Sequence, residues 1–249
     1  MPTHRFFPNR LFHFLLLMLA SLIAPAPLVL LLNNCGHSLQ TLLIYSAECF
    51  MFLLLVVIIN RRRNVPIARF YTNRLDGLWL ALLIVVIIQL FISIPVVQII
   101  NLNLASHNSL PTANNPAFEI LSSVLLAPIF EESIFRGVLL RGLTTRYSKP
   151  ISILISSIVF ALIHIQPAQI LPALILGLLF GVIFVRTHSL IYTIILHSTA
   201  NAIVQINTHL TLSDFYLPQN TLPILSLILL ASLITLYLTT RLHTHMSHT

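Results

Sequence analysis

Long, uninterrupted apolar runs constrain the fold of this chain more than any other feature. Eight of them are visible, at approximately 11–32, 39–60, 77–100, 117–140, 151–166, 169–185, 190–206 and 222–240. A helix needs roughly 20 mostly apolar residues to cross a hydrocarbon core of about 30 Å. The runs are continuously apolar and do not alternate as barrel strands do. They predict an all-α fold, a polytopic transmembrane helix bundle of about eight spans.

The shortage of charge supports this class and excludes others. Only 8% of the 249 residues are Asp, Glu, Lys or Arg, and 57% are hydrophobic. About a quarter of an average soluble sequence is charged, so this chain has too few ionised side chains to solvate a surface of its own. A water-soluble domain, a disordered chain and a nucleic-acid binder are excluded. Membrane lipid is the first expected partner.

The basic residues indicate how the bundle is oriented. With eight alternating spans, all but one of the thirteen Lys and Arg residues fall on one side of the membrane. The loops of the other side, 33–38, 101–116, 167–168 and 207–221, contain none. Lys and Arg accumulate in cytoplasmic loops. We therefore expect both termini to be cytoplasmic, and the short loops fit an integral protein of the bacterial inner membrane.

The first apolar run shares features with a secretory signal peptide. A basic start and an apolar core lead to Ala24-Pro25-Ala26, a small-residue sequence of the kind found at cleavage sites. However, Pro27 follows at once and the apolar run resumes as far as Leu32. We favour a retained helix that is kinked at Pro25 and Pro27, because proline removes a helix hydrogen bond. Cleavage of this segment stays the alternative.

Three charged residues lie inside the fourth run. Glu131 and Glu132 are adjacent in LLAPIFEESIFRGVLL, and Arg136 follows them. Each charge at mid-bilayer costs on the order of 3 kcal/mol on insertion scales. Glu132 and Arg136 are four residues apart and can form an ion pair on one helix face, whereas Glu131 lies about 100° around the helix. This pattern indicates either a functional site or a buried network that only locks helices together.

Two other runs carry polar groups at a similar depth. His164 ends FALIH in the fifth run, and HSTAN in the seventh run places His197 and Asn201 on one helix face. At about 1.5 Å per residue from the basic ends, these residues and Glu131 fall in one slab near the membrane middle. A carboxylate with an imidazole can deprotonate water, and His197 with Asn201 can stabilise an oxyanion. The same groups are also reasonable Zn²⁺ ligands.

The three motifs together resemble a known family. EESIFRG, FALIH and HSTAN, in this order on alternating spans, match the pattern EExxxR, FxxxH and HxxxN. This is the pattern of the CPBP family of intramembrane endopeptidases, also called Abi, which includes CAAX prenyl-protein endopeptidases and bacteriocin-processing or immunity proteins. The similarity covers residues 117–206, spans four to seven. It divides the chain into spans one to three (1–116), this catalytic core, and an outer loop, last span and tail (207–249).

The resemblance implies roles for individual residues. Glu131 would activate the water together with His164, Glu132 and Arg136 would pair to hold the site, and His197 with Asn201 would form the oxyanion pocket. Members of the family have been classed both as metalloproteases and as glutamate proteases. With a metal, the Zn²⁺ ligands would be Glu131, His164 and His197. We favour the metal-free form, because four tight protein ligands are not evident in the sequence.

The resemblance also leaves alternatives for the function. The leading hypothesis is an endopeptidase that cleaves a membrane-associated peptide or protein, either prenylated and CAAX-like or of the leader or bacteriocin type. A non-proteolytic immunity or scaffold protein with the same fold is the second hypothesis. Proton-coupled transport is a third, although no inverted repeat is visible. Neither the substrate nor the oligomeric state follows from the sequence.

Two local features of the core carry further expectations. Gly177 and Gly181 form a GxxxG in the sixth run, which we expect to permit tight packing within the bundle rather than dimerisation. His188 stands in the turn before the seventh run, where the family often has glycine. We expect that difference to have no effect on chemistry, because the turn belongs to the cytoplasmic side.

Overall fold

The computed structural model describes residues 6–23, 25–32, 36–65, 75, 77–103, 116–164, 166–210 and 221–247. Within these ranges all regular structure is helical, which confirms the all-α prediction. The first elements are α1 (Leu11–Ile23), α2 (Ala26–Leu31), α3 (His37–Arg62), α4 (Leu78–Ile88), the π-helix η2 (Gln89–Ser93) and α5 (Ile94–Asn103). A continuous helical stretch follows, made of α6 (Pro116–Ile120), η3 (Leu121–Leu126), α7 (Ala127–Glu132), η4 (Ser133–Leu140) and α8 (Arg141–Thr144). The last are α9 (Lys149–Leu162), α10 (Pro167–Thr187), α11 (Leu190–Leu210) and α12 (Thr221–Ser247).

Five helical segments are long and apolar enough to cross a membrane. They are Leu11–Leu28, Leu39–Arg62, Leu78–Ile100, Pro167–Thr187 and Leu225–Leu242, and Lys149–Leu162 is a shorter apolar helix. The predicted spans 117–140 and 190–206 are also helical, but they carry the ionised, His, Asn and Gln side chains that lower their apolar character. The protein is therefore a helical membrane protein, and the count of eight spans stays a prediction.

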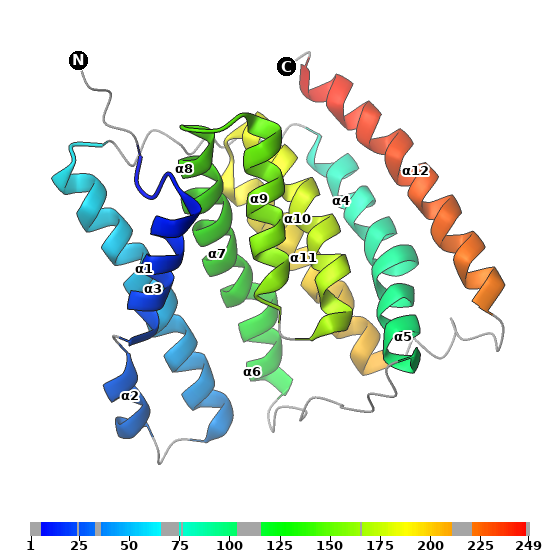
Figure 1. Ribbon diagram of the computed structural model, residues 1–249. Coiled ribbons are helices and arrows are strands. Elements are labelled where there is room, and N and C mark those ends of the chain that lie inside the picture. The colour runs from blue at the N-terminus through cyan, green and yellow to red at the C-terminus, as the bar shows by residue number, and fades with distance from the viewer. Residues whose placement is uncertain are drawn as a thin grey trace.

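The helices lie side by side in one bundle (Figure 1). Helices α1 to α3 form one flank, α12 forms the other, and α7, α9, α10 and α11 stand between them. The closest packing joins α9 to α10, while α12 packs mainly on α4 and η2. Helix α11 contacts η3, α7 and α4, which places it along the helix that contains Glu131 and Glu132.

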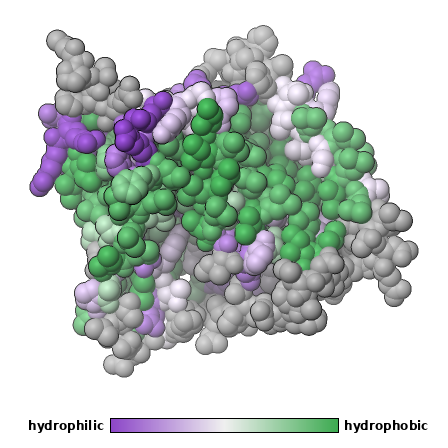
Figure 2. All heavy atoms as spheres, in the orientation of Figure 1, coloured by the Kyte–Doolittle hydropathy of each residue, from purple (hydrophilic) through white to green (hydrophobic). Residues whose placement is uncertain are grey.

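The ends of the helices agree with the predicted two-sided distribution of charge. Helices α3, α8, α10 and α12 all end on the side of the bundle where α1, α4 and α9 begin (Figure 1). Figure 2 shows a broad hydrophobic band across the visible face, with hydrophilic residues along this edge. The basic residues Arg5, Arg69 and Arg74 lie outside the described residues. The assignment of this side to the cytoplasm stays a prediction.

Two apolar clusters fill the interior of the bundle. One joins α1, α3, η4 and α9 through Phe14, Phe52, Phe135 and Phe160, all at most 2% exposed. The other joins α4, α10 and α11 and includes Ile84, Phe180, Tyr192 and Leu196, all of them 0% exposed. The charged residues of the fourth predicted span lie where these two clusters meet.

The proline pair in the first run ends one helix and begins another. Helix α1 ends at Ile23, and α2 begins at Ala26 with Pro25 as its N-cap. Pro27 lies in the first turn of α2, where a missing backbone N–H is tolerated. The predicted kink is therefore a break between two helices.

The GxxxG pair in α10 permits close packing inside the bundle, as predicted. A Cβ on Gly177 would lie 3.2 Å from Cβ of Ser157 and 3.3 Å from the Phe160 ring. A Cβ on Gly181 would lie 3.0 Å from Ile153. All three neighbours belong to α9, so the two glycines determine how closely α9 and α10 approach.

Candidate active site

Two π-helical segments flank the short helix that carries the adjacent glutamates. Helix α7 follows η3 and precedes η4, so Glu131 and Glu132 lie in its last turn and Arg136 in the first turn of η4. Pro128 in the first turn of α7 cannot donate a backbone hydrogen bond. π-Helical turns that interrupt α-helices are frequent at functional sites. Apolar periodicity in the sequence carries no signal for them.

Glu132 lies at the centre of the polar cluster and is sealed from solvent. Its Oε1 accepts a hydrogen bond of 2.8 Å from Nη1 of Arg136, which confirms the predicted ion pair. The same Oε1 lies 2.9 Å from Nδ1 of His197. The side chains of Glu132 and Arg136 are 0% and 1% exposed. Burial of such a pair is tolerable only when each charge is compensated in place.

Arg136 is enclosed by groups that suit a buried guanidinium. Its Nη2 donates to the backbone carbonyl of Gly177 at 3.3 Å. Its Cζ lies 4.5 Å from the ring centroid of Phe160 and 5.5 Å from that of Phe180. Aromatic faces attract cations more strongly when water is excluded. Helices α9 and α10 therefore complete the environment of a charge carried by η4.

Glu131 differs from its neighbour in exposure and in partners. Its side chain is 20% exposed, and Oε2 lies 3.8 Å from Nε2 of His197. Oε1 accepts a long hydrogen bond of 3.4 Å from the hydroxyl of Tyr45 on α3. Two adjacent carboxylates thus have separate environments: Glu132 is committed to protein partners, whereas Glu131 retains access to a small molecule.

His197 connects the two carboxylates through its two ring nitrogens. Nδ1 is paired with Glu132, and Nε2 is turned toward Glu131. The rings of Phe160 and Phe180 each lie 5.7 Å from the imidazole, centroid to centroid. A hydrogen bond at one ring nitrogen determines what the other nitrogen can do. The orientation of this imidazole is therefore defined on both sides.

Asn201 and His164 lie near the cluster without contacting Glu131 among the described residues. Nδ2 of Asn201 donates to the carbonyl of Ser123 in η3 at 2.8 Å. Nδ1 of His164 lies 3.0 Å from the carbonyl of Phe160, and the His164 and Phe160 rings are 5.2 Å apart. The ring of Phe160 thus contacts the imidazoles of both His164 and His197.

The donor atoms do not fit the Zn²⁺ alternative as they are arranged. Within the described ranges, no three His, Cys, Asp or Glu side chains converge as metal ligands would. Nδ1 of His197 is paired with Glu132 and Nδ1 of His164 with a carbonyl, which leaves Nε2 of each available, so it is the lack of convergence that argues against the metal site.

One polar group at the site was not predicted. Tyr45 lies outside the motif region, in the segment TLLIYSAECF of the second apolar run. Its ring packs edge-on against Phe130, the residue before Glu131, with the centroids 6.1 Å apart. Without homologous sequences, a single tyrosine in an apolar helix carries no signal that relates it to the motifs.

Comparison with protein families agrees with the motifs. Residues 113–203 match the family model of type II CAAX prenyl endopeptidases, Rce1-like. This part of the chain therefore matches the CAAX protease family. The matched range contains all six motif residues and ends just after Asn201, and it does not include α1 to α5 or α12. The comparisons with curated proteins and with solved structures returned no match. The family implies a membrane-associated CAAX-type endopeptidase.

Proposed function

We propose that the protein is an intramembrane endopeptidase that hydrolyses a peptide bond of a membrane-associated substrate. The substrate is either a prenylated, CAAX-like protein or a leader or bacteriocin-type peptide. One observation carries the proposal: a partly exposed Glu131 faces Nε2 of His197 at 3.8 Å, beside a sealed Glu132 and Arg136 pair. A carboxylate that is open to water beside an oriented imidazole suits hydrolysis.

Glu131 acts as the general base in this proposal. Its carboxylate accepts a proton from a water molecule as the water oxygen attacks the carbonyl carbon of the scissile bond. Glu131 then returns that proton to the amine nitrogen as the carbon–nitrogen bond breaks. His164 assists by accepting a hydrogen bond from the same water through Nε2, since its Nδ1 is directed at a carbonyl. Base catalysis of this kind contributes about 10²- to 10⁴-fold in rate.

His197 and Asn201 stabilise the oxyanion. When both nitrogens of His197 carry protons, Nδ1 donates to Glu132 and Nε2 donates to the developing negative charge. Asn201 lies one turn further along α11 and supplies its amide when substrate displaces the hydrogen bond to Ser123. Donors aimed at the position where charge develops are worth about 10² to 10³ each in kcat.

Glu132 and Arg136 position these groups without reacting themselves. Glu132 orients His197, and Arg136 supplies the positive charge that makes a buried carboxylate tolerable. We propose that no resident metal ion takes part. Hydrolysis is then unaffected by a strong chelator. Loss of activity with the chelator, restored by Zn²⁺, would instead assign Glu131, His164 and His197 as metal ligands.

The proposed setting is the cytoplasmic membrane of a bacterium, with both termini in the cytoplasm. Substrate reaches Glu131 from the cytoplasmic side or from within the bilayer. The basic helix ends on one side of the bundle support this orientation, since Lys and Arg are retained in the cytoplasm.

The decisive experiment compares Glu131→Gln and His197→Ala with the unchanged protein in cleavage of two peptides, one prenylated and one of the leader type. We expect both variants to lose at least about 100-fold in rate while remaining folded. Ser133→Ala is the matched control, because Ser133 lies in the same helical stretch and its hydroxyl donates to the backbone carbonyl of Ile129. Full cleavage by Glu131→Gln would refute the proposal. A biological effect that survives Glu131→Gln would favour the immunity or scaffold function.

A further inference from the structure

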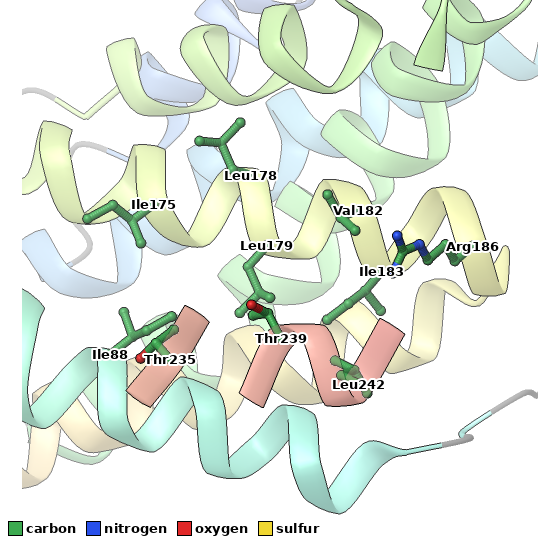
Figure 3. Close-up of a pocket in the computed structure, with 10 residues that line it drawn as sticks. All are labelled: Ile88, Ile175, Leu178, Leu179, Val182, Ile183, Arg186, Thr235, Thr239 and Leu242. Atoms are coloured by element: carbon green, nitrogen blue, oxygen red, sulfur yellow. The ribbon is translucent and has the colours of Figure 1, made fainter. Parts of the chain in front are cut away.

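Helix α10 has a second feature on the face opposite the candidate active site. Gly177 and Phe180 face the Glu132 and Arg136 pair. At about 100° per residue, Arg186 lies about 180° around the helix from Gly177. Ile175, Leu179 and Val182 belong to the same outer face as Arg186. They line a cavity of about 320 Å³ between α10, α4 and α12 (Figure 3).

The cavity is long, apolar and basic at one end. Its walls are aliphatic side chains, with two threonines of α12, Thr235 and Thr239. From Ile175 to Arg186 it follows about 16 Å of α10, at about 1.5 Å per residue. Figure 3 shows Arg186 at one end and Ile175 at the other. The cavity therefore combines a slot for a hydrocarbon chain with one positive charge.

Arg186 is placed to meet an anion. It belongs to the last turn of α10, is exposed, and has neither an ion pair nor a hydrogen bond among the described residues. It lies on the side of the bundle where α3 and α8 also end with basic residues. An exposed arginine at the end of a membrane helix lies at the level of the lipid headgroups. Basic pockets between membrane helices bind anionic headgroups.

We propose that this cavity is a binding site for an anionic phospholipid. One acyl chain lies along Ile175, Leu179 and Val182, and the headgroup phosphate pairs with Arg186. Helix α12 packs on α4 and η2, so the chain would fill the space that separates α12 from α10. The bound lipid then acts as a structural ligand that joins the last helix to the core.

The position of the cavity argues against the lipid group of a substrate as its occupant. A prenyl chain in the cavity would be separated from Glu131 by the full width of α10, since Gly177 faces Arg136 from the other side. The reacting peptide bond could not reach the carboxylate. The phospholipid site is therefore independent of the proposed proteolysis.

The test uses the full-length protein in detergent, with defined lipids added. Phosphatidylglycerol and phosphatidylcholine with the same acyl chains are compared by native mass spectrometry and by the midpoint of thermal unfolding. Ligands that bind only the folded state raise that midpoint. We expect phosphatidylglycerol to bind more tightly and to stabilise more. Arg186→Gln should reduce its apparent affinity about fivefold, to the level of phosphatidylcholine.

Two variants make the outcome specific. Arg146→Gln removes an exposed arginine from the same side of the bundle that does not line the cavity, and it should leave the preference for phosphatidylglycerol unchanged. Val182→Trp fills the slot and should weaken binding of both lipids. Equal binding of the two lipids would overturn the proposal, and so would equal losses in Arg186→Gln and Arg146→Gln. Glu131→Gln should bind lipid normally, which separates this test from that of the proteolytic function.

Discussion

The two faces of α10 accommodate an arginine in opposite ways. On the inner face, Arg136 of η4 is 1% exposed, paired with Glu132, bonded to the Gly177 carbonyl and covered by two phenylalanine rings. On the outer face, Arg186 ends the helix, is exposed, and stands at the mouth of an apolar cavity. A charge within the bilayer region must be paired inside the protein, whereas a charge at the helix end can reach the polar interface. The inner arrangement makes a site rigid, and the outer one leaves a charge available for a ligand.

The same substitution at both arginines should have very different effects on stability. Arg136→Leu leaves Glu132 buried without its cation, which costs about 3–5 kcal/mol. Arg186→Leu removes an exposed charge, and such changes are usually within about 0.5 kcal/mol. Thermal unfolding in detergent should show a large fall in midpoint for the first and almost none for the second. A double variant, Glu132→Leu with Arg136→Leu, should recover part of the loss. If it does not, pairing is not what stabilises the inner face.

The glycines of this region offer a second comparison, between a tight helix contact and a loose one. Gly177→Ala should destabilise, because its Cβ would lie 3.2 Å from Ser157 and 3.3 Å from Phe160. Overpacking of this kind costs about 1–3 kcal/mol. Gly137→Ala is the control, since its nearest neighbours would be 3.9 Å away. Alanine is favoured over glycine in helices by up to about 1 kcal/mol, so this control should be neutral or stabilising. Equal unfolding midpoints would contradict the close contact at Gly177.

A substitution of Tyr45 tests whether α3 contributes to catalysis at the candidate active site. Tyr45→Phe removes a hydroxyl that donates to Glu131 at 3.4 Å. A hydrogen bond is worth about 0.5–1.5 kcal/mol. At 3.4 Å this one is long, so we expect the lower end, which corresponds to about a twofold change in rate. We expect kcat to fall by that amount with KM unchanged, because the hydroxyl positions Glu131 rather than substrate. Tyr147→Phe, at an exposed turn, should have no effect. A change confined to the unfolding midpoint would reduce Tyr45 to a packing residue.

The last comparison concerns the C-terminal end of α10. His188 adopts a φ of 52°, in the left-handed region that favours glycine. His188→Gly should therefore stabilise the protein by roughly 1 kcal/mol. Burial, with a smaller contribution from Lys149, lowers the pKa of His188 from its ordinary 6.5. The unfolded chain then binds the proton more readily, so stability falls as the pH drops below about 6.5. The glycine variant should lose that part of the pH dependence, as unfolding midpoints between pH 5 and 8 would show.

Much of the candidate site follows from the sequence because its chemistry is local. The Glu132 and Arg136 pair depends only on a spacing of four residues, and the structure contains it. The GxxxG of α10 and its internal role follow from residue size. The turn at His188 is a position that favours glycine, which gives a physical reason for the glycine that the family often has there.

The sequence alone determined that the chain is a helical membrane protein, which polar residues lie within the apolar segments, and which family its core resembles. Hydropathy and short spacings are sufficient for this, since each is a property of one segment. Only the tertiary structure decided which polar side chains from different helices contact one another. It directs Nδ1 of His197 to Glu132, leaves Glu131 partly open, adds Tyr45 from α3, and separates the lipid-sized cavity from the site by the width of α10. These relations depend on how helices pack and on where π-turns rotate them, and no pattern within a single segment contains that information.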